Sequence, residues 1–269
     1  MLSAIHRRVV PSAVLLSLLV AFVVAAPAGA ITYGTIEFGH AYVGAIIVDL
    51  TGIIPNLGIL EWCSGTLVSA RVFLTAGHCI DPLIRLQVPK DKVWVSFAVN
   101  IWQDQSSWRS VSGWELHPDY NWGPTSDPHD IGAIVLAKRV RDIAPAKIAP
   151  VGYLDGLQSA DKLKTATFIN VGYGSNESFQ VDGWRKISYS SFQSLHDAWL
   201  YMSQNIHSDG GGTCFGDSGG PTFYHDGTTE WIVATVSWGD AMCVATNINY
   251  RADLQVGQDF VYGMIASAS

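Results

Sequence analysis

Cys214-Phe215-Gly216-Asp217-Ser218-Gly219-Gly220-Pro221 is the stretch around which the rest of this sequence can be ordered. It places a serine between an aspartate and two glycines, a pattern suited to acyl transfer. The small residues let the backbone turn sharply, so the amides of Gly216 and Ser218 can point at one developing oxyanion. A serine hydroxyl alone is a poor nucleophile. We therefore predict a histidine that accepts its proton and a carboxylate that orients the histidine.

Both partners lie upstream of the serine. His78 ends the run Leu74-Thr75-Ala76-Gly77-His78-Cys79, and Asp130 precedes the apolar run Ile131–Leu136. Gly216-x-Ser218-x-Gly220 also fits the nucleophile elbow of α/β-hydrolases, in which the order is Ser, Asp or Glu, then His. Only His225 follows Ser218, with no strand, helix and acid arranged as that fold requires. The order His, Asp, Ser excludes the elbow.

This ordered set resembles the trypsin/chymotrypsin-like serine proteases, of the bacterial secreted type. The resemblance covers nearly the whole chain after residue 30. Besides the segments quoted above, it rests on Ile31-Thr32-Tyr33-Gly34, Cys63-Ser64-Gly65-Thr66-Leu67-Val68, Val171-Gly172-Tyr173-Gly174 and Val236-Ser237-Trp238-Gly239.

The resemblance assigns a role to each residue of the site. It makes His78, Asp130 and Ser218 the catalytic triad of a serine endopeptidase, with Gly216 and Ser218 as the oxyanion hole. It places Ser237 beside Asp130. The substrate-binding residues would be Gly212, Thr213, Phe215, Ser237, Trp238 and Gly239.

The resemblance also implies a substrate preference. It puts Gly212 at the floor of the primary specificity pocket, where a trypsin-like enzyme carries an acid. Asp209 lies three residues too early for that position, so we expect an uncharged floor. Gly239 would leave the entrance open, and Ile248 would make the pocket shallower. We expect cleavage after an apolar or aromatic residue.

Residues 1–30 read as a secretory signal peptide. Arg7 and Arg8 form the basic start, the run 14–25 is apolar, and Ala28-Gly29-Ala30 supplies a cleavage site. A membrane anchor is the alternative, but prolines bracket an apolar run of about 15 residues, shorter than the roughly 20 that span a bilayer. We predict a secreted, extracellular protein with no membrane contact after cleavage.

The cleavage site directly precedes Ile31. In the family, a freed α-amine pairs with the aspartate before the nucleophile, so the resemblance makes Ile31 and Asp217 the activation pair. Signal removal alone would then release the active chain. A different cut or a second processing step is the alternative.

Composition agrees with a secreted globular domain. The 269 residues are 48% hydrophobic and 14% charged, with 26 glycines, which favours turn-rich β structure. Loss of residues 1–30 would change the formal charge from −7 to −9. Lysine and arginine are scattered, so we expect no nucleic-acid partner. Protein or peptide substrates, a monomer and no cofactor are expected.

The four cysteines favour disulfides in an exported chain. Spacing alone leaves all three pairings open, whereas the resemblance suggests Cys63 with Cys79 and Cys214 with Cys243. No pair has the C-x-x-C spacing and the histidines do not cluster, so we expect no metal site.

Short β-branched and aromatic runs predict an all-β protein. They are 43–48, 92–97, 131–136, 165–171 and 231–236. The resemblance makes these two six-stranded antiparallel β-barrels, about 31–145 and about 146–269, with a short C-terminal helix over 253–265. The catalytic domain would be 31–269, and the crossing would lie within 141–150.

Two other functions fit parts of the sequence. A secreted, non-catalytic protease homologue would act as a binding protein, but it would have no reason to keep all three triad residues. An esterase would use the same acyl-enzyme. Asn176-Glu177-Ser178 matches a glycosylation sequon, a pattern that is frequent by chance.

Overall fold

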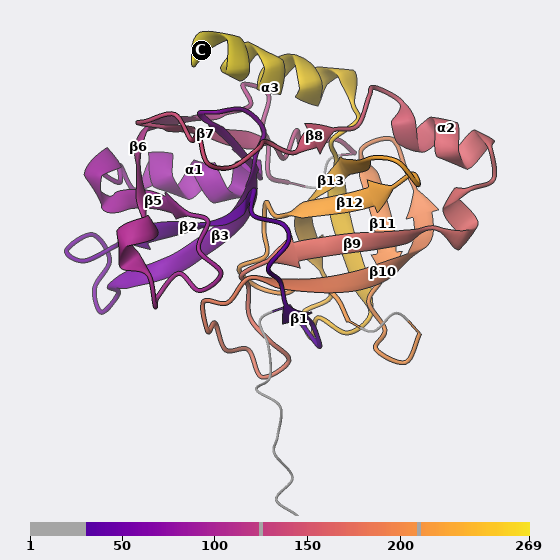
Figure 1. Cartoon of the computed structure of the whole chain (residues 1–269), viewed down its shortest axis with the longest axis horizontal. Coiled ribbons are helices and arrows are strands. Elements are labelled where there is room, and N and C mark those ends of the chain that lie inside the picture. The colour runs from indigo at the N-terminus through magenta and orange to yellow at the C-terminus, as the bar shows by residue number, and fades with distance from the viewer. Residues whose placement is uncertain (1–30, 124–125, 209–210) are drawn as a thin grey trace, which may run out of the picture.

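The computed structural model describes residues 31–123, 126–208 and 211–269. The signal-peptide prediction for 1–30 and the residue Asp209 lie outside this part of the chain. Two β-barrels lie side by side, the first formed by the N-terminal half and the second by the C-terminal half (Figure 1). The predicted fold class, two six-stranded antiparallel barrels with a C-terminal helix, is confirmed.

The first barrel closes in the order β2-β3-β4-β7-β6-β5, with every neighbouring pair antiparallel. Its strands are β2 (Val43–Asp49), β3 (Ile59–Leu67), β4 (Val72–Thr75), β5 (Val93–Ser96), β6 (Arg109–Leu116) and β7 (Gly132–Leu136).

Strand β2 carries no polar side chain from Val43 to Val48, and its burial explains why. Ile46 and Val48 pack in the core of the first barrel, whereas Ala45 and Ile47 belong to a second cluster shared with the other barrel. Successive side chains of a strand point to opposite faces. Both faces of β2 are buried, so the run lacks the polar alternation of an exposed strand.

The second barrel closes in the order β9-β10-β11-β14-β13-β12, and β12 pairs back with β9. Its strands are β9 (Thr167–Gly172), β10 (Lys186–Leu195), β11 (Trp199–Ser203), β12 (Pro221–His225), β13 (Glu230–Gly239) and β14 (Thr246–Arg251). Two short strands add to it: β1 (Thr35–Ile36) pairs with β10, and β8 (Lys147–Ile148) pairs in parallel with β13.

The described part of the chain also contains three α-helices: α1 (Gly77–Arg85), α2 (Tyr153–Ser159) and α3 (Gln255–Ser267). The predicted C-terminal helix is thus present, displaced by two residues, and it lies over the first barrel (Figure 1). Single 3₁₀ turns occur at Lys90–Lys92, Gln105–Ser107 and Leu163–Thr165. Within the described residues, no helix has the length and hydropathy needed to cross a membrane.

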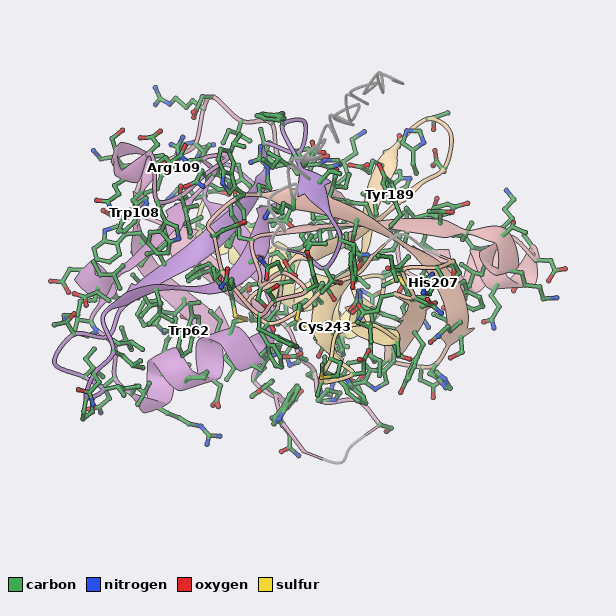
Figure 2. The ribbon with its side chains drawn as sticks, turned by 90° about the horizontal axis from the view of Figure 1, so that it is seen from below. Trp62, Trp108, Arg109, Tyr189, His207 and Cys243 are labelled. Carbon is green, nitrogen blue, oxygen red and sulfur yellow. A yellow bond between two sulfur atoms is a disulfide. The ribbon has the colours of Figure 1, made fainter. Side chains whose placement is uncertain are left out.

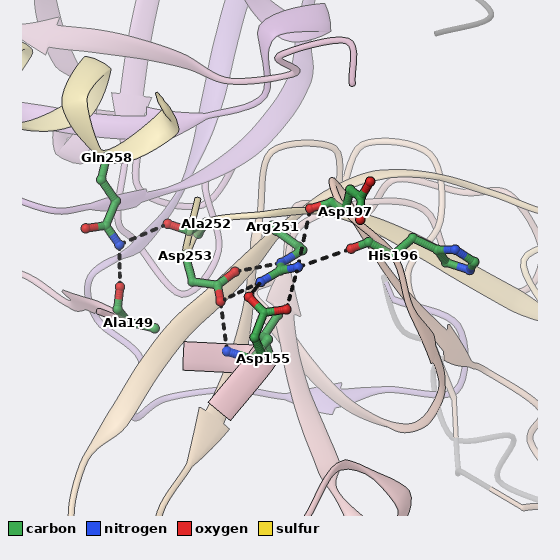
Figure 3. Close-up of polar contacts among 9 residues, drawn as sticks. Ala149, Asp155, His196, Asp197, Arg251, Ala252, Asp253 and Gln258 are labelled. Atoms are coloured by element: carbon green, nitrogen blue, oxygen red, sulfur yellow. Dashed lines mark hydrogen bonds and ion pairs between the residues drawn. The ribbon is translucent and has the colours of Figure 1, made fainter. Parts of the chain in front are cut away.

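A buried arginine at the end of the second barrel contacts α2, which follows the first barrel, and the turn that leads into α3. The Arg251 side chain is 3% exposed and pairs with Asp253 (Nε–Oδ1 2.9 Å) and with Asp155 of α2 (Figure 3). Asp253 Oδ2 also accepts the Leu154 amide at 2.8 Å. The carboxylate of Asp253 is fully buried, so the guanidinium is its charge partner. This network fixes the start of α2 and the turn into α3.

We expect Arg251→Met to reduce the free energy of unfolding by about 3–5 kcal/mol, because removal of one partner leaves a buried charge uncompensated. Urea unfolding measures this directly. Arg85→Met is the matched control: Arg85 pairs with Asp81 at 2.8 Å but is 74% exposed, so its loss should cost under about 1 kcal/mol. Equal losses for the two variants would contradict the role given to Arg251.

Candidate active site

His78 lies in the first turn of α1, directly after strand β4. Its imidazole Nδ1 lies 2.9 Å from Asp130 Oδ2, and its backbone amide donates to Asp130 Oδ1 at 2.8 Å. Asp130 immediately precedes Ile131 and strand β7, which pairs with β4. Adjacent strands therefore bring together two residues that are 52 positions apart in the sequence.

The Asp130 carboxylate is fully buried and well supplied with hydrogen-bond donors. Ser237, at the end of β13 in the second barrel, donates its hydroxyl to Asp130 Oδ2. Burial raises the pKa of Asp130, but the charge and hydrogen bonds of His78 and the Ser237 hydroxyl outweigh burial and lower it below its usual value. Asp130 is thus ionised at neutral pH and accepts the Nδ1 proton of His78, which leaves Nε2 free as a base.

Ser218 lies in the loop before strand β12. In this loop the amides of Asp217, Gly219 and Gly220 donate to the carbonyls of Cys214, Val236 and Asp217. The amides of Gly216 and Ser218 donate to no acceptor within the described part of the chain. Gly216 has a φ of +96° and Gly219 a φ of +75°, which a glycine adopts without strain. Two neighbouring amides thus remain available for one external oxygen.

The carbonyls of the same loop are held by the first barrel. Ser64 of β3 donates its amide to Ser218 O at 2.9 Å and its hydroxyl to Gly216 O at 3.0 Å. The Ser64 hydroxyl also accepts the Tyr173 amide at 3.0 Å. These bonds fix the peptide planes that flank the two free amides. The free amides of Gly216 and Ser218 share their own peptide planes with the carbonyls of Phe215 and Asp217, which accept the amides of Ser175 and Gly220 at 2.6 and 2.8 Å.

His78 and Ser218 come from different barrels. No hydrogen bond joins them among the described residues, but Ser218 O lies 3.6 Å from Sγ of Cys79, the residue next to His78. Catalytic hydrogen bonds are often long without substrate and shorten in the complex. The His78 ring also lies 5.2 Å from the Trp122 ring, which is half exposed at the rim of the site.

Asp217 points away from Ser218 into the protein. It is 1% exposed, and its carboxylate accepts the amides of Gly174 and Cys214 at 2.9 and 2.8 Å. Burial raises its pKa to about 7, against the lowering effect of these two amides and of the Lys186 charge. No basic group forms an ion pair with Asp217 in the part of the chain that the structure describes.

Ile31 is fully buried at the start of the described chain. The next residue, Thr32, forms a β-bridge with Gly212, and its hydroxyl donates to the carbonyls of Gly212 and Cys243. Ile31 has a φ of +60°, a left-handed conformation that is unusual for a β-branched residue.

A cavity of about 320 Å³ opens beside Ser218. Of the predicted substrate-binding residues, Thr213, Phe215, Ser237, Trp238 and Gly239 line it; the other lining residues are Cys214, Ser218, Val236, Asp240, Ala241 and Cys243. The lining is mostly apolar. A mostly apolar concave lining with a few polar groups is typical of a site that takes an apolar side chain.

Gly212 and Ile248 are not among the residues that line this cavity. Gly212 is buried against Gln204, whose side chain occupies the space that a Cβ at position 212 would need. Gln204 Oε1 accepts the Thr213 amide at 3.0 Å, and Gln204 Nε2 donates to Asp240 at 3.3 Å. Gln204, just after the preceding strand β11, thus fills the position behind the wall of the cavity.

Asp240 brings a carboxylate to the wall of the cavity. Its oxygens accept the amides of Val244, Ala245 and Thr246, besides the Gln204 side chain. Although burial raises the pKa of Asp240, these hydrogen bonds lower it below its usual value. Four donors already share its charge.

Both expected disulfides are present, Cys63–Cys79 and Cys214–Cys243. The first joins β3 to α1, next to His78, and Trp62 Nε1 donates to Cys79 O at 2.8 Å. The second joins the Ser218 loop to the opposite side of the cavity; Figure 2 labels Cys243 near the middle of the molecule. One cluster of His and Cys side chains with metal-ligand spacing occurs in the described chain, but its two cysteines form the first disulfide.

His129, which precedes Asp130, and Asn176 of the glycosylation sequon both make contacts within the fold. His129 stacks on His117, with ring centroids 4.8 Å apart. Asn176 is 2% exposed, and its side-chain oxygen accepts the amides of Ser178 and Gln180. The sequon is therefore folded into a turn that leaves little room for a glycan.

Comparison with known proteins agrees with this site. Residues 53–259 match the Trypsin family. A trypsin-like protease from Streptomyces glaucescens is 28% identical over 191 residues, which cover 66% of this chain and 65% of that protein. Coagulation factor IX from Cavia porcellus is 25% identical over 200 residues, covering 66% of this chain and 64% of that protein. The matched part is thus just under two thirds of the length of these relatives. The chain belongs to the trypsin family of serine proteases.

Four residues at the site escaped the sequence analysis: Ser64, Trp122, Gln204 and Asp240. Ser64 stands in a quoted motif but was given no role of its own. Trp122, Gln204 and Asp240 lie in no sequence motif that would assign them to the site, because their positions depend on loop paths and on packing between strands.

We expect Ser64→Ala to slow the labelling of Ser218 by a fluorophosphonate about tenfold, the equivalent of one net hydrogen bond. The loss frees the Gly216 carbonyl and leaves the buried Tyr173 amide without its acceptor. Ser112→Ala is the matched control, since Ser112 also donates to a carbonyl, that of Val135, but on the exposed face of the first barrel. Equal labelling rates for Ser64→Ala and Ser112→Ala would contradict this role.

Proposed function

We propose that this chain is a secreted serine endopeptidase that hydrolyses peptide bonds through an acyl-enzyme on Ser218. The observation that carries the proposal is the free pair of amides at Gly216 and Ser218, beside a cavity and a His78–Asp130 pair. A pocket for a side chain, a base and a preformed oxyanion site are the three parts that acyl transfer requires.

In the proposed reaction, Ser218 Oγ attacks the carbonyl carbon of the substrate while His78 Nε2 accepts its proton. The negative charge that develops on the substrate oxygen is stabilised by the Gly216 and Ser218 amides, each worth about 3 kcal/mol of the barrier. Asp130 holds the imidazole and stabilises its protonated form.

The imidazolium of His78 then protonates the departing amine, and the C–N bond breaks to leave an ester on Ser218. Water takes the place of the amine and gives a proton to His78 while its oxygen bonds to the acyl carbon. The bond from that carbon to Ser218 Oγ then breaks, His78 returns the proton to Oγ, and the acid product leaves. No cofactor takes part in this sequence. Esters would react in the same way, so esterase activity is expected alongside peptidase activity.

We propose an apolar or aromatic residue before the scissile bond. The mostly apolar lining of the cavity supports this preference. The Asp240 carboxylate already accepts hydrogen bonds from four donors, so it offers little to a substrate lysine or arginine.

We propose that Ile31 and Asp217 form the activation pair. An α-ammonium at Ile31 would supply the cation that the buried Asp217 carboxylate lacks in the described chain. Cleavage before Ile31 would also remove the strain of its left-handed φ. The φ angle is defined by the carbonyl carbon of the preceding residue, which cleavage removes. The two disulfides agree with an extracellular location.

A diverse peptide library tests the proposed activity. The purified chain that begins at Ile31 should cut preferentially after apolar or aromatic residues, and Ser218→Ala should lose at least about 10³-fold in rate. Ser112→Ala should retain full activity. Preferential cleavage after lysine or arginine would overturn the side-chain preference. The absence of cleavage by the unmutated chain would favour the non-catalytic binding protein.

A chain extended by Ala28-Gly29-Ala30 tests the activation pair. It should be at least tenfold less active than the chain that begins at Ile31, because it lacks the α-ammonium. In a Ser218→Ala background, its stability should fall as pH rises from about 4 to about 7, since burial raises the pKa of Asp217 from 3.8 to about 7. The chain that begins at Ile31 should lose less stability over the same pH range. Equal activity and equal pH dependence would rule out the pair.

A further inference from the structure

Glu61 is a buried carboxyl on strand β3 that the proposed reaction does not use. It is 7% exposed and lies opposite Ile47 of β2. Its Oε1 atom has no hydrogen-bond partner, and no basic group forms an ion pair with it among the described residues. A carboxylate in such surroundings is costly, so the position requires an explanation.

The Glu61 carboxyl lies directly against the glycine of the free amide pair. A Cβ on Gly216 would lie 2.6 Å from Glu61 Oε2 and 2.9 Å from the Cα of Gly174. Glu61 thus packs against the loop on the side of Gly216 where a side chain would stand. A charge on Glu61 would act at short range on whatever charge develops in front of Gly216.

Burial raises the pKa of Glu61 well above its usual value, and the charge of the buried Asp217 carboxyl adds to this rise. Glu61 in turn acts on the phenol of Tyr173. Burial raises the pKa of Tyr173 to about 12, the charge and hydrogen bond of Arg185 lower it, and Glu61 adds a smaller rise. The surroundings of Glu61 thus favour its protonated form.

The two buried cations nearby are engaged elsewhere. Arg185 donates to backbone carbonyls, including those of Val43 and Phe97, and to the Tyr173 hydroxyl. Lys186 pairs with Asp182 at 2.5 Å. Neither stands as a counter-ion against Glu61.

We propose that Glu61 is a positioning residue that supports the oxyanion-binding loop only while its carboxyl carries a proton. The inference rests on the proposed function. When the proton leaves, a second negative charge appears beside Asp217 and behind Gly216. That charge repels the oxyanion in surroundings of low polarity. Glu61 thus sets an upper pH limit on the rate of acyl transfer.

Glu61→Gln tests the proposal, because glutamine keeps the shape of the neutral acid and cannot lose the proton. The experiment measures kcat and KM from pH 6 to pH 11 for the chain that begins at Ile31. The alkaline midpoint of kcat should move upward by about one pH unit, with KM little changed. Glu115→Gln, which removes an exposed acid from β6, is the matched control and should leave the midpoint in place.

An alkaline midpoint that stays in place or moves downward in Glu61→Gln would overturn the proposal. Such a result would mean that deprotonation of the Ile31 α-ammonium alone sets the alkaline limit of kcat. Glu61→Met, a second neutral side chain of similar length, should reproduce the upward shift. It keeps the test decisive if Glu61→Gln does not fold.

A stability measurement separates this proposal from the proposed function. In a Ser218→Ala background, urea unfolding at pH 5 and pH 9 should show a loss of stability with rising pH that Glu61→Gln reduces. A raised folded-state pKa of a carboxyl has this sign, because the folded state holds its proton longer. If the unmutated chain hydrolyses no substrate, the proposed function fails, but the urea unfolding measurement still reports whether Glu61 is protonated. If the pH dependence of stability is unchanged in Glu61→Gln, Glu61 does not hold a proton in the folded state and the proposal fails.

Discussion

The buried carboxylate of Asp217 fixes the loop on which the proposed chemistry depends. Its two oxygens accept the amides of Gly174 and Cys214, which holds the side chain inside the protein. The neighbouring amides of Gly216 and Ser218 have no acceptor within the described chain. A carboxylate is costly to bury without a cation. The site is therefore built around an interaction that an α-ammonium at Ile31 would complete, and that coupling would link processing of the chain to the geometry of the site.

The second barrel does not shape the site alone. The first barrel supplies His78, Asp130 and the Ser64 contacts to both carbonyls of the loop. A cluster of apolar residues from both barrels, including Ile131 and Val171, is buried between them. In the proposed reaction, each half carries groups that act only together with those of the other, so that reaction requires a fixed relative position of the two barrels.

The sequence predicted the parts of this protein that local chemistry determines. The His, Asp, Ser order predicted a triad whose His78–Asp130 pair is present in the structure, and short apolar runs predicted strands that are present. Asp240 at the cavity wall and Gln204 behind it could not be predicted, because their positions depend on loop paths that are set by packing. Gly212 was placed at the pocket floor by position in the chain, whereas the Gln204 side chain fills the space beside it. Glu61 carries no signal in the sequence, since only the fold shows that it is buried against Gly216.

The most direct test of the account is a crystal structure of the chain that begins at Ile31, bound to a peptide aldehyde with an aromatic terminal residue. The account requires a hemiacetal on Ser218 Oγ, its oxygen accepting the Gly216 and Ser218 amides, and the Ile31 nitrogen within hydrogen-bond distance of Asp217. A structure with the Ile31 nitrogen in solvent, or with either amide bonded to the protein instead of the hemiacetal oxygen, would contradict it.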